Sequence, residues 1–189
     1  MRLLLVVIAL LATPAAASDL SAHELSALAR GHPVVVVQPA PDGASGMIRA
    51  AIDIAAPPEV VFKVIADCDL ATRMVESLKS CRIVERDPAG RWDVREQVSK
   101  MTFVPSVTNL FRSDYEPPTH VSFHRVGGDL KVFEGEWRIE PHGEGARVFY
   151  ESRVSAPFRV PGYLARLALR FEVPKALIAL RRESLARAR

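Results

Sequence analysis

The sequence predicts an α+β fold in which a curled antiparallel sheet of about six or seven strands surrounds a long C-terminal helix. From Cys81 onward, apolar and polar residues alternate in runs separated by turn-like segments. After Pro161 and Gly162 the chain ends in a long stretch with an apolar face. A twisted sheet of this size curls, and its concave face needs a cover, which only the last helix is long enough to provide.

Short segments rich in glycine and proline separate the candidate strands of the second half, which favours antiparallel neighbours. These strands are 81–87, 91–99, 109–115, 119–126, 131–140 and 146–155. The stretch 100–108, which contains Pro105, has no clear pattern. Pro174 is expected to kink the last helix or to split it.

The pattern in the first half of the chain predicts fewer helices and strands. The expected elements are a helix over 21–30, a short β-branched run over 34–37, a loop over 38–46, a strand over 47–54, a helix starting at Pro57-Pro58, and a second helical piece through Met74, Val75 and Leu78.

Residues 1–17 have the pattern of a secretory signal peptide. Arg2 precedes an apolar run from Leu3 to Ala12, and Ala15-Ala16-Ala17 supplies small residues before a cut at Ser18. This run is too short to span a bilayer, which takes about 20 apolar residues. We therefore expect a periplasmic or secreted protein; the alternative is an uncleaved N-terminal anchor.

Composition is typical of a globular protein, with 49% hydrophobic and 25% charged residues. The formal net charge of +3 is mild, so we expect no nucleic-acid partner.

Cys68 and Cys81 are the two cysteines of the chain. In an oxidising compartment they would close a loop worth about 3 kcal/mol on the chain-entropy model. The alternative is two separate buried thiols. No metal site is expected, because His120 and His124 would lie about 13 Å apart on a strand.

Three segments resemble the START-like (SRPBCC) superfamily, and most closely its polyketide cyclase/dehydrase and coenzyme-Q-binding branch. They are Ile52–Asp69, Val126–Pro141 with its G-x-W core, and Ala146–Ser152 before the last helix. The resemblance implies a helix-grip fold with an apolar cavity, and it divides the chain into a signal peptide (1–17), an N-terminal extension (18–45) and a ligand-binding domain (46–189). Leu70–Cys81 departs from the aromatic-proline stretch of many relatives, so the cavity mouth is expected to differ.

Polar residues on predicted inward faces are candidates for the site. Alternation with apolar neighbours places Glu96 and Arg125 inward, where they could pair or hold a polar ligand head. In related cyclases, scattered polar cavity residues direct enolate chemistry, so Glu96, Arg125, Tyr115 and Tyr150 are the catalytic candidates. Structural and ligand-orienting roles remain open, and none is assigned as catalytic. The candidate ligand-binding residues are Trp92, Glu96, Tyr115, Phe123, Arg125, Phe133, Trp137, Tyr150 and Phe171.

We expect an exported binding or carrier protein for a hydrophobic small molecule, such as a quinone, isoprenoid or other lipid, with no cofactor. The sequence contains no G-x-S-x-G elbow, P-loop or G-x-G-x-x-G motif. The alternatives are a polyketide cyclase or dehydratase, and an envelope interaction protein whose cavity is filled by its own side chains.

The last helix is basic, with seven Lys or Arg and two Glu from Pro161 onward. Such a helix is suited to transient contact with an anionic membrane surface. The alternative is an ordinary helix with a solvated outer face.

Overall fold

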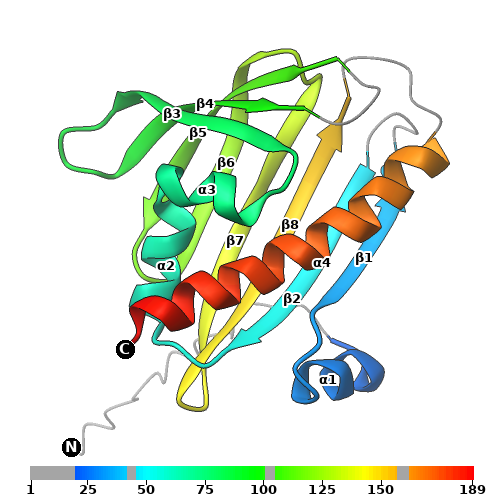
Figure 1. The fold of residues 1–189 in the computed structure, drawn as a ribbon, viewed down its shortest axis with the longest axis vertical. Coiled ribbons are helices and arrows are strands. Elements are labelled where there is room, and N and C mark those ends of the chain that lie inside the picture. Colours follow the sequence, from blue (N-terminus) through cyan, green and yellow to red (C-terminus); the bar gives the residue numbers. More distant parts are fainter. Residues whose placement is uncertain (1–19, 42–45, 101–104, 157–161) are drawn as a thin grey trace, which may run out of the picture.

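The computed structural model describes residues 20–41, 46–100, 105–156 and 162–189, without the side chains of 162–166 (Figure 1). The expected signal peptide therefore lies outside the described residues. The elements are α1 (Ala22–Ala29), β1 (Val34–Pro39), β2 (Gly46–Ile54), α2 (Pro58–Ala66), α3 (Cys68–Met74), β3 (Leu78–Arg86), β4 (Trp92–Ser99), β5 (Val107–Glu116), β6 (His120–Gly128), β7 (Val132–His142), β8 (Gly145–Ser155) and α4 (Gly162–Arg187).

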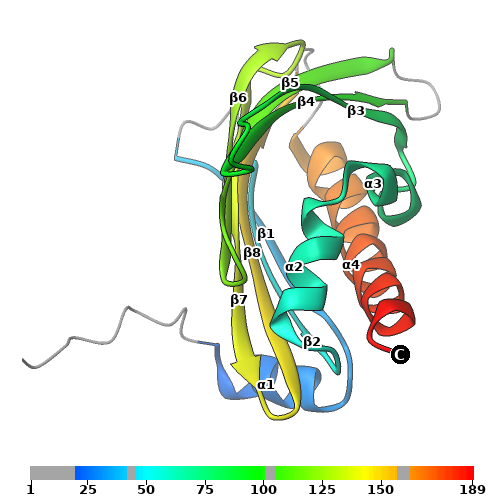
Figure 2. The ribbon, with the colours of Figure 1, turned by 90° about the vertical axis from the view of Figure 1, so that its left-hand side faces the viewer.

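In the described ranges, eight strands form one antiparallel sheet in the order β1-β2-β8-β7-β6-β5-β4-β3. The predicted fold class is confirmed: α4 crosses the sheet, and β3, β4 and β5 curl over it (Figures 1 and 2). The strand count exceeds the expected six or seven because the β-branched run 34–37 pairs with β2 as an edge strand.

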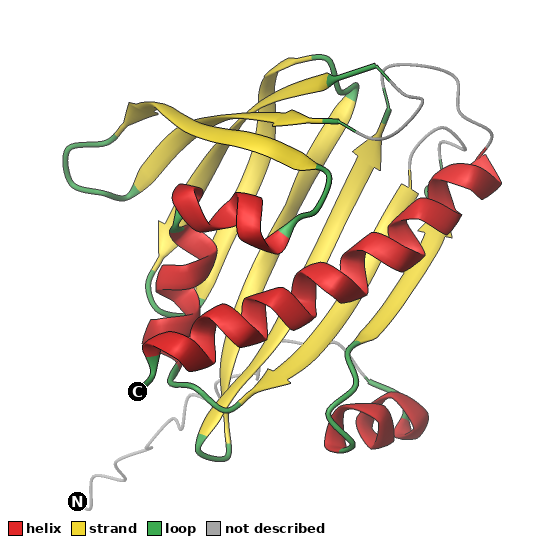
Figure 3. Ribbon diagram, in the orientation of Figure 1, coloured by secondary structure: helices red, strands yellow, loops and turns green. Residues whose placement is uncertain are grey.

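The helices α2, α3 and α4 all lie on one face of the sheet (Figures 2 and 3). We call this the inner face. The short helix α1 packs on the other face, where Leu28 contacts a small cluster with Ala51 and Phe149. A capping box between Ser21 and Glu24 fixes the start of α1.

The main core lies between the sheet and the helices α2 and α4. Alternate residues of β2 and β8, including Ile52 and Val148, are fully buried there against Val61 of α2 and Leu177 of α4. This follows from the period-two pattern of the strands, which directs one set of side chains toward the helices.

Pro174 does not split α4, which is assigned as one helix from Gly162 to Arg187. Val173 and Leu177, on either side of the proline, both pack against the core. These contacts hold the two halves in line although the proline removes one backbone hydrogen bond. Within the described residues, no helix is both long and apolar enough to cross a bilayer.

The helical piece expected near Met74–Leu78 is wrong in position. The helix α3 runs earlier, from Cys68 to Met74, because the side chain of Asp67 accepts a hydrogen bond of 2.9 Å from the Asp69 amide and caps its start. The chain is already a strand at Leu78. Of the patternless stretch 100–108, residues 101–104 lie outside the described residues, and β5 begins at Val107.

Candidate functional site

Five aromatic side chains from the described strands cover the centre of the inner face and form a continuous series of ring contacts. Ring centroids lie 5.0 Å apart for Phe111 and Phe133, 4.8 Å for Phe133 and Phe123, and 6.1 Å for Phe123 and Tyr150. Trp137 and Tyr150 are closest, at 4.3 Å. We call this set the aromatic layer; its members are Phe111, Phe123, Phe133, Trp137 and Tyr150.

A glycine in β7 makes room for the layer. Gly135 pairs with Phe123 of β6, and a Cβ at Gly135 would lie only 2.8 Å from the ring of Phe123. The missing side chain therefore allows this ring to lie over β7, where it reaches the rings of Phe133 and Tyr150.

The aromatic layer is incompletely covered, although it faces a helix. Phe133, Trp137 and Tyr150 are half-buried. On α4, Leu177 is 1% exposed, whereas Val173, one turn earlier, is half-buried. The packing of α4 is thus tight at Leu177 and looser at Val173.

Tyr150 lies deep in the inner face, but its side chain is only half-buried. Burial raises the pKa of its hydroxyl, and the nearby Ser152 hydroxyl offsets part of that shift. Ser152 Oγ itself is buried and makes no hydrogen bond with the residues that the structure describes. The two hydroxyls form a neutral polar spot beside the rings.

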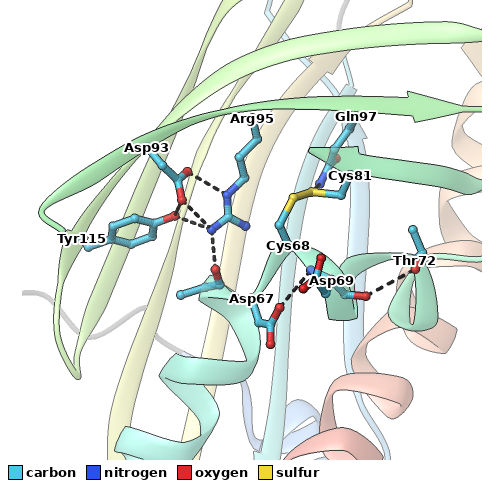
Figure 4. Close-up of a disulfide and its surroundings, with 10 residues drawn as sticks. Asp67, Cys68, Asp69, Thr72, Cys81, Asp93, Arg95, Gln97 and Tyr115 are labelled. Carbon is cyan, nitrogen blue, oxygen red and sulfur yellow. Dashed lines mark hydrogen bonds and ion pairs between the residues drawn. A yellow bond between two sulfur atoms is a disulfide. The ribbon is translucent and has the colours of Figure 1, made fainter. Parts of the chain in front are cut away.

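A buried ionic cluster lies at the β4 side of the inner face (Figure 4). The Arg95 guanidinium donates hydrogen bonds of 2.8 and 3.1 Å to the Asp93 carboxylate, and both side chains are about 5% exposed or less. The Tyr115 hydroxyl donates to Asp93 Oδ2 over 2.8 Å and accepts from Arg95. Burial, with the hydrogen bond to Asp93, raises the pKa of Tyr115 despite the opposing charge of Arg95.

Arg95 also ties the helices to the sheet. It donates to the carbonyl of Ala66, the last residue of α2. Directly after this point, Cys68 forms a disulfide with Cys81 of β3, with the Cα atoms 5.5 Å apart (Figure 4). Of the two alternatives that the sequence left open for the cysteines, the structure has the disulfide.

An open pocket of about 540 Å³ adjoins the disulfide between α2, α3 and β3. Phe62 and Ile83 give it an apolar wall, while Lys63, Arg86 and Asp67 line its polar side. A second pocket, of about 490 Å³, has mixed charges and lies over β1, β2, β7 and β8. Neither is lined by a ring of the aromatic layer.

Several predicted site residues lie together as expected. Phe123, Phe133, Trp137 and Tyr150 belong to the aromatic layer, and Tyr115 faces inward to contact Phe62 edge-on at 6.1 Å.

The predicted inward orientation of Trp92 and Glu96 is wrong. In β4 the buried residues are Asp93 and Arg95, so Trp92 and Glu96 point to the opposite face. There the Arg112 guanidinium stacks over Trp92 at 4.3 Å, and Glu96 pairs with Arg82 at 3.0 Å. The mutual neutralisation of Asp93 and Arg95 allows charged residues to occupy the inner face.

Arg125 and Phe171 also differ from expectation. Arg125 is exposed and donates to the carbonyl of Gly128, so it does not pair with Glu96. Arg125 is still paired with Phe111 in the β5–β6 register, and the register shift follows directly after it, between Phe111 and Leu110. Phe171 is 65% exposed on the outer side of α4.

Asp93 and Arg95 were not among the predicted site residues. Opposite charges two residues apart on a strand share a face, and this spacing was the available signal. The apolar set of Trp92, Val94 and Val98 gave the stronger but opposite indication.

The two histidines of β6 are not brought together with further ligands. His120 is half-buried and lies 3.2 Å from Glu136, and His124 is exposed. Among the described residues, no group of three or more His, Cys, Asp or Glu side chains is arranged to hold a metal ion.

Comparison with solved structures shows the same fold in distant relatives. A STAR-related lipid transfer protein from Xanthomonas axonopodis is 16% identical, covers 80% of this chain and 93% of its own, and has a TM-score of 0.69. The protein TTHA0849 from Thermus thermophilus is 24% identical, with coverages of 76% and 99% and a TM-score of 0.65. The Zhui aromatase/cyclase from Streptomyces sp. R1128 is 16% identical, with coverages of 76% and 93% and a TM-score of 0.59.

No curated protein sequence matches the chain significantly. The family model described as polyketide cyclase/dehydrase and lipid transport matches residues 54–181, which is more than half of the chain. The matched region runs from the last residue of β2 through most of α4. The chain therefore belongs to the polyketide cyclase/dehydrase and lipid transport family.

Proposed function

We propose that this protein binds and carries a hydrophobic small molecule, such as a quinone, an isoprenoid or another lipid, on the aromatic layer beneath α4. The observation that carries this proposal is the partial exposure of Phe133, Trp137 and Tyr150 on a face that a helix crosses. A ligand in this position would cover these rings, and each Å² of apolar surface removed from water contributes about 25 cal/mol.

Tyr150 is the proposed orienting group. Its hydroxyl is protonated at neutral pH, as in any tyrosine, and burial raises its pKa further, so it can donate a hydrogen bond to a carbonyl or hydroxyl of the ligand. Tyr115 is less suited to this role because its hydroxyl already donates to Asp93. Glu96 lies on the opposite face, and the exposed Arg125 donates to the carbonyl of Gly128, so neither takes part in this proposal.

The family description includes lipid transport, and the Xanthomonas neighbour is named a lipid transfer protein. Both support carriage of a lipid-like ligand without identifying it.

We further propose that the protein is exported, with residues 1–17 removed as a signal peptide, leaving the extension 18–45 and the domain 46–189. The Cys68–Cys81 disulfide supports this, because such bonds persist in oxidising compartments. A carrier in the periplasm or outside the cell would meet membranes directly, and we propose that the basic C-terminal helix makes that contact.

A second candidate function is catalysis of the cyclase or dehydratase type. The buried cluster of Asp93, Arg95 and Tyr115 favours it, because convergent ionisable groups with a raised tyrosine pKa are common at active sites. One solved neighbour is named an aromatase/cyclase. Turnover of a polyketide-like substrate that is lost in Tyr115→Phe but retained in Arg82→Met would favour this function.

The carrier proposal is tested by extracting the natively purified, exported protein with organic solvent and identifying co-purifying molecules by mass spectrometry. The expected result is a hydrophobic compound that is depleted from Trp137→Ala but retained by Trp92→Ala, whose altered ring lies on the other face. Absence of any such compound, together with no binding to a panel of quinones, isoprenoids and fatty acids, would refute the proposal.

A further inference from the structure

The outer side of α4 carries a row of exposed apolar side chains. Leu167, Phe171 and Ile178 are 49%, 65% and 51% exposed. Their spacings of four and seven residues place them within about 40° of one another around a helix. We call these three residues the outer ridge. It is distinct from the side of α4 that packs on the core, which includes Val173, Leu177 and Leu180.

Basic residues flank the outer ridge. Arg170, Lys175 and Arg182 are all exposed. Lys175 pairs with Glu76 over 3.0 Å, but both partners are largely exposed, and such a pair contributes little energy. Arg182 keeps 66% of its side chain exposed.

The two acidic residues of α4 are mostly engaged away from the outer ridge, although Glu183 also lies 3.4 Å from Arg182. Glu172 accepts a hydrogen bond of 3.1 Å from the Ser77 amide. Glu183 is 8% exposed, and its carboxylate is held by Arg187 at 2.9 Å. The exposed surface of the helix is therefore apolar along its centre and positive along its margins.

We infer that the outer ridge docks on an anionic lipid bilayer, with Leu167, Phe171 and Ile178 at the boundary of headgroups and acyl chains. The flanking bases would lie against lipid phosphates, which attract them electrostatically. A second copy of the chain is a poorer partner, because a two-fold contact along the ridge would bring like-charged margins together. This inference names the surface for the proposed membrane contact, but it stands on the geometry of α4 and does not require a ligand on the aromatic layer.

The test is co-sedimentation of the exported protein, its mature mass verified, with vesicles of phosphatidylcholine alone or mixed with phosphatidylglycerol. Binding to the anionic vesicles is expected, and it should weaken as salt rises. Phe171→Ser should lower this binding about tenfold, since it removes a large apolar side chain that the bilayer would bury. Arg170→Glu should weaken binding to anionic vesicles specifically.

Val126→Ser is the matched control, because Val126 is 46% exposed but lies on β6. It should bind like the wild type. Unfolding midpoints of all variants establish that each is folded. The ligand content of each variant is measured separately, so that a loss of vesicle binding can be distinguished from a loss of the ligand of the carrier proposal. The inference is overturned by equal binding to both vesicle types, by no binding to anionic vesicles at low salt, or by an equal loss in Val126→Ser. A dimer in sedimentation velocity that Phe171→Ser dissociates would instead assign the outer ridge to a second copy.

Discussion

The carboxylate of Asp93 receives two hydrogen bonds from the guanidinium of Arg95, of 2.8 and 3.1 Å, where both side chains are almost completely buried. Through the carbonyl of Ala66, the same guanidinium fixes the end of α2. The pair thus joins β4 of the sheet to the end of α2.

Arg95→Met should therefore destabilise the fold strongly. Removing one partner leaves a buried charge uncompensated, which costs about 3–5 kcal/mol of unfolding free energy. Urea unfolding followed by circular dichroism measures it. The control is Arg82→Met, which breaks the exposed pair with Glu96 and should cost about 1 kcal/mol or less. Equal losses in the two variants would contradict the structural role given to Arg95.

Loss of the disulfide should also lower stability. Replacing both Cys68 and Cys81 by Ser is expected to cost about 3 kcal/mol, because the unfolded chain regains the freedom of a short loop. Reductant should lower the wild-type unfolding midpoint and leave the double variant unchanged. A wild type insensitive to reductant under unfolding conditions would refute the pairing.

Stability should fall at alkaline pH. Burial raises the pKa of Tyr115 and that of Tyr150 above the ordinary value of 10.0. A pKa raised in the folded state gives stability that is complete below about pH 10 and is lost as pH rises through the folded pKa. Unfolding free energies at about pH 8, 10 and 11 should decline less steeply in Tyr115→Phe than in the wild type. Identical slopes would show that Tyr115 titrates normally.

Tyr150→Phe should weaken ligand binding without unfolding the protein. A single neutral hydrogen bond contributes about 1 kcal/mol, or about fivefold in the dissociation constant, for a ligand with a carbonyl or hydroxyl group. Isothermal titration with a short-chain quinone measures it, and a purely hydrocarbon ligand is the control. If the hydrocarbon loses as much affinity as the quinone, Tyr150 acts by packing alone.

Much of the fold could be predicted because period-two alternation and Gly/Pro-rich turns are local signals. The same alternation predicted the inward position of Phe123, Phe133, Trp137 and Tyr150, where apolar and aromatic residues dominate one face. The pattern failed in β4, because the buried residues there are a mutually neutralising ion pair and the apolar Trp92 is covered by Arg112 instead.

The exposure of Arg125 and Phe171 also could not be predicted from the local pattern of apolar and polar residues. Arg125 keeps its pairing with Phe111, but its side chain is exposed and donates to the carbonyl of Gly128, next to the β5–β6 register shift. Phe171 lies on a helix that is apolar on two sides, and only the packing of Val173 and Leu177 shows which side faces the sheet.

The most direct test of ligand binding on the aromatic layer uses the position of the two tryptophans, Trp137 within the layer and Trp92 on the opposite face. Trp92→Phe and Trp137→Phe each leave a single tryptophan. Each variant is titrated with quinones, isoprenoids and fatty acids while the fluorescence of its remaining tryptophan is recorded. The account predicts a saturable change in Trp137 emission in Trp92→Phe and none in Trp137→Phe. No saturable change from Trp137 with any ligand, or a change reported only by Trp92, would contradict it.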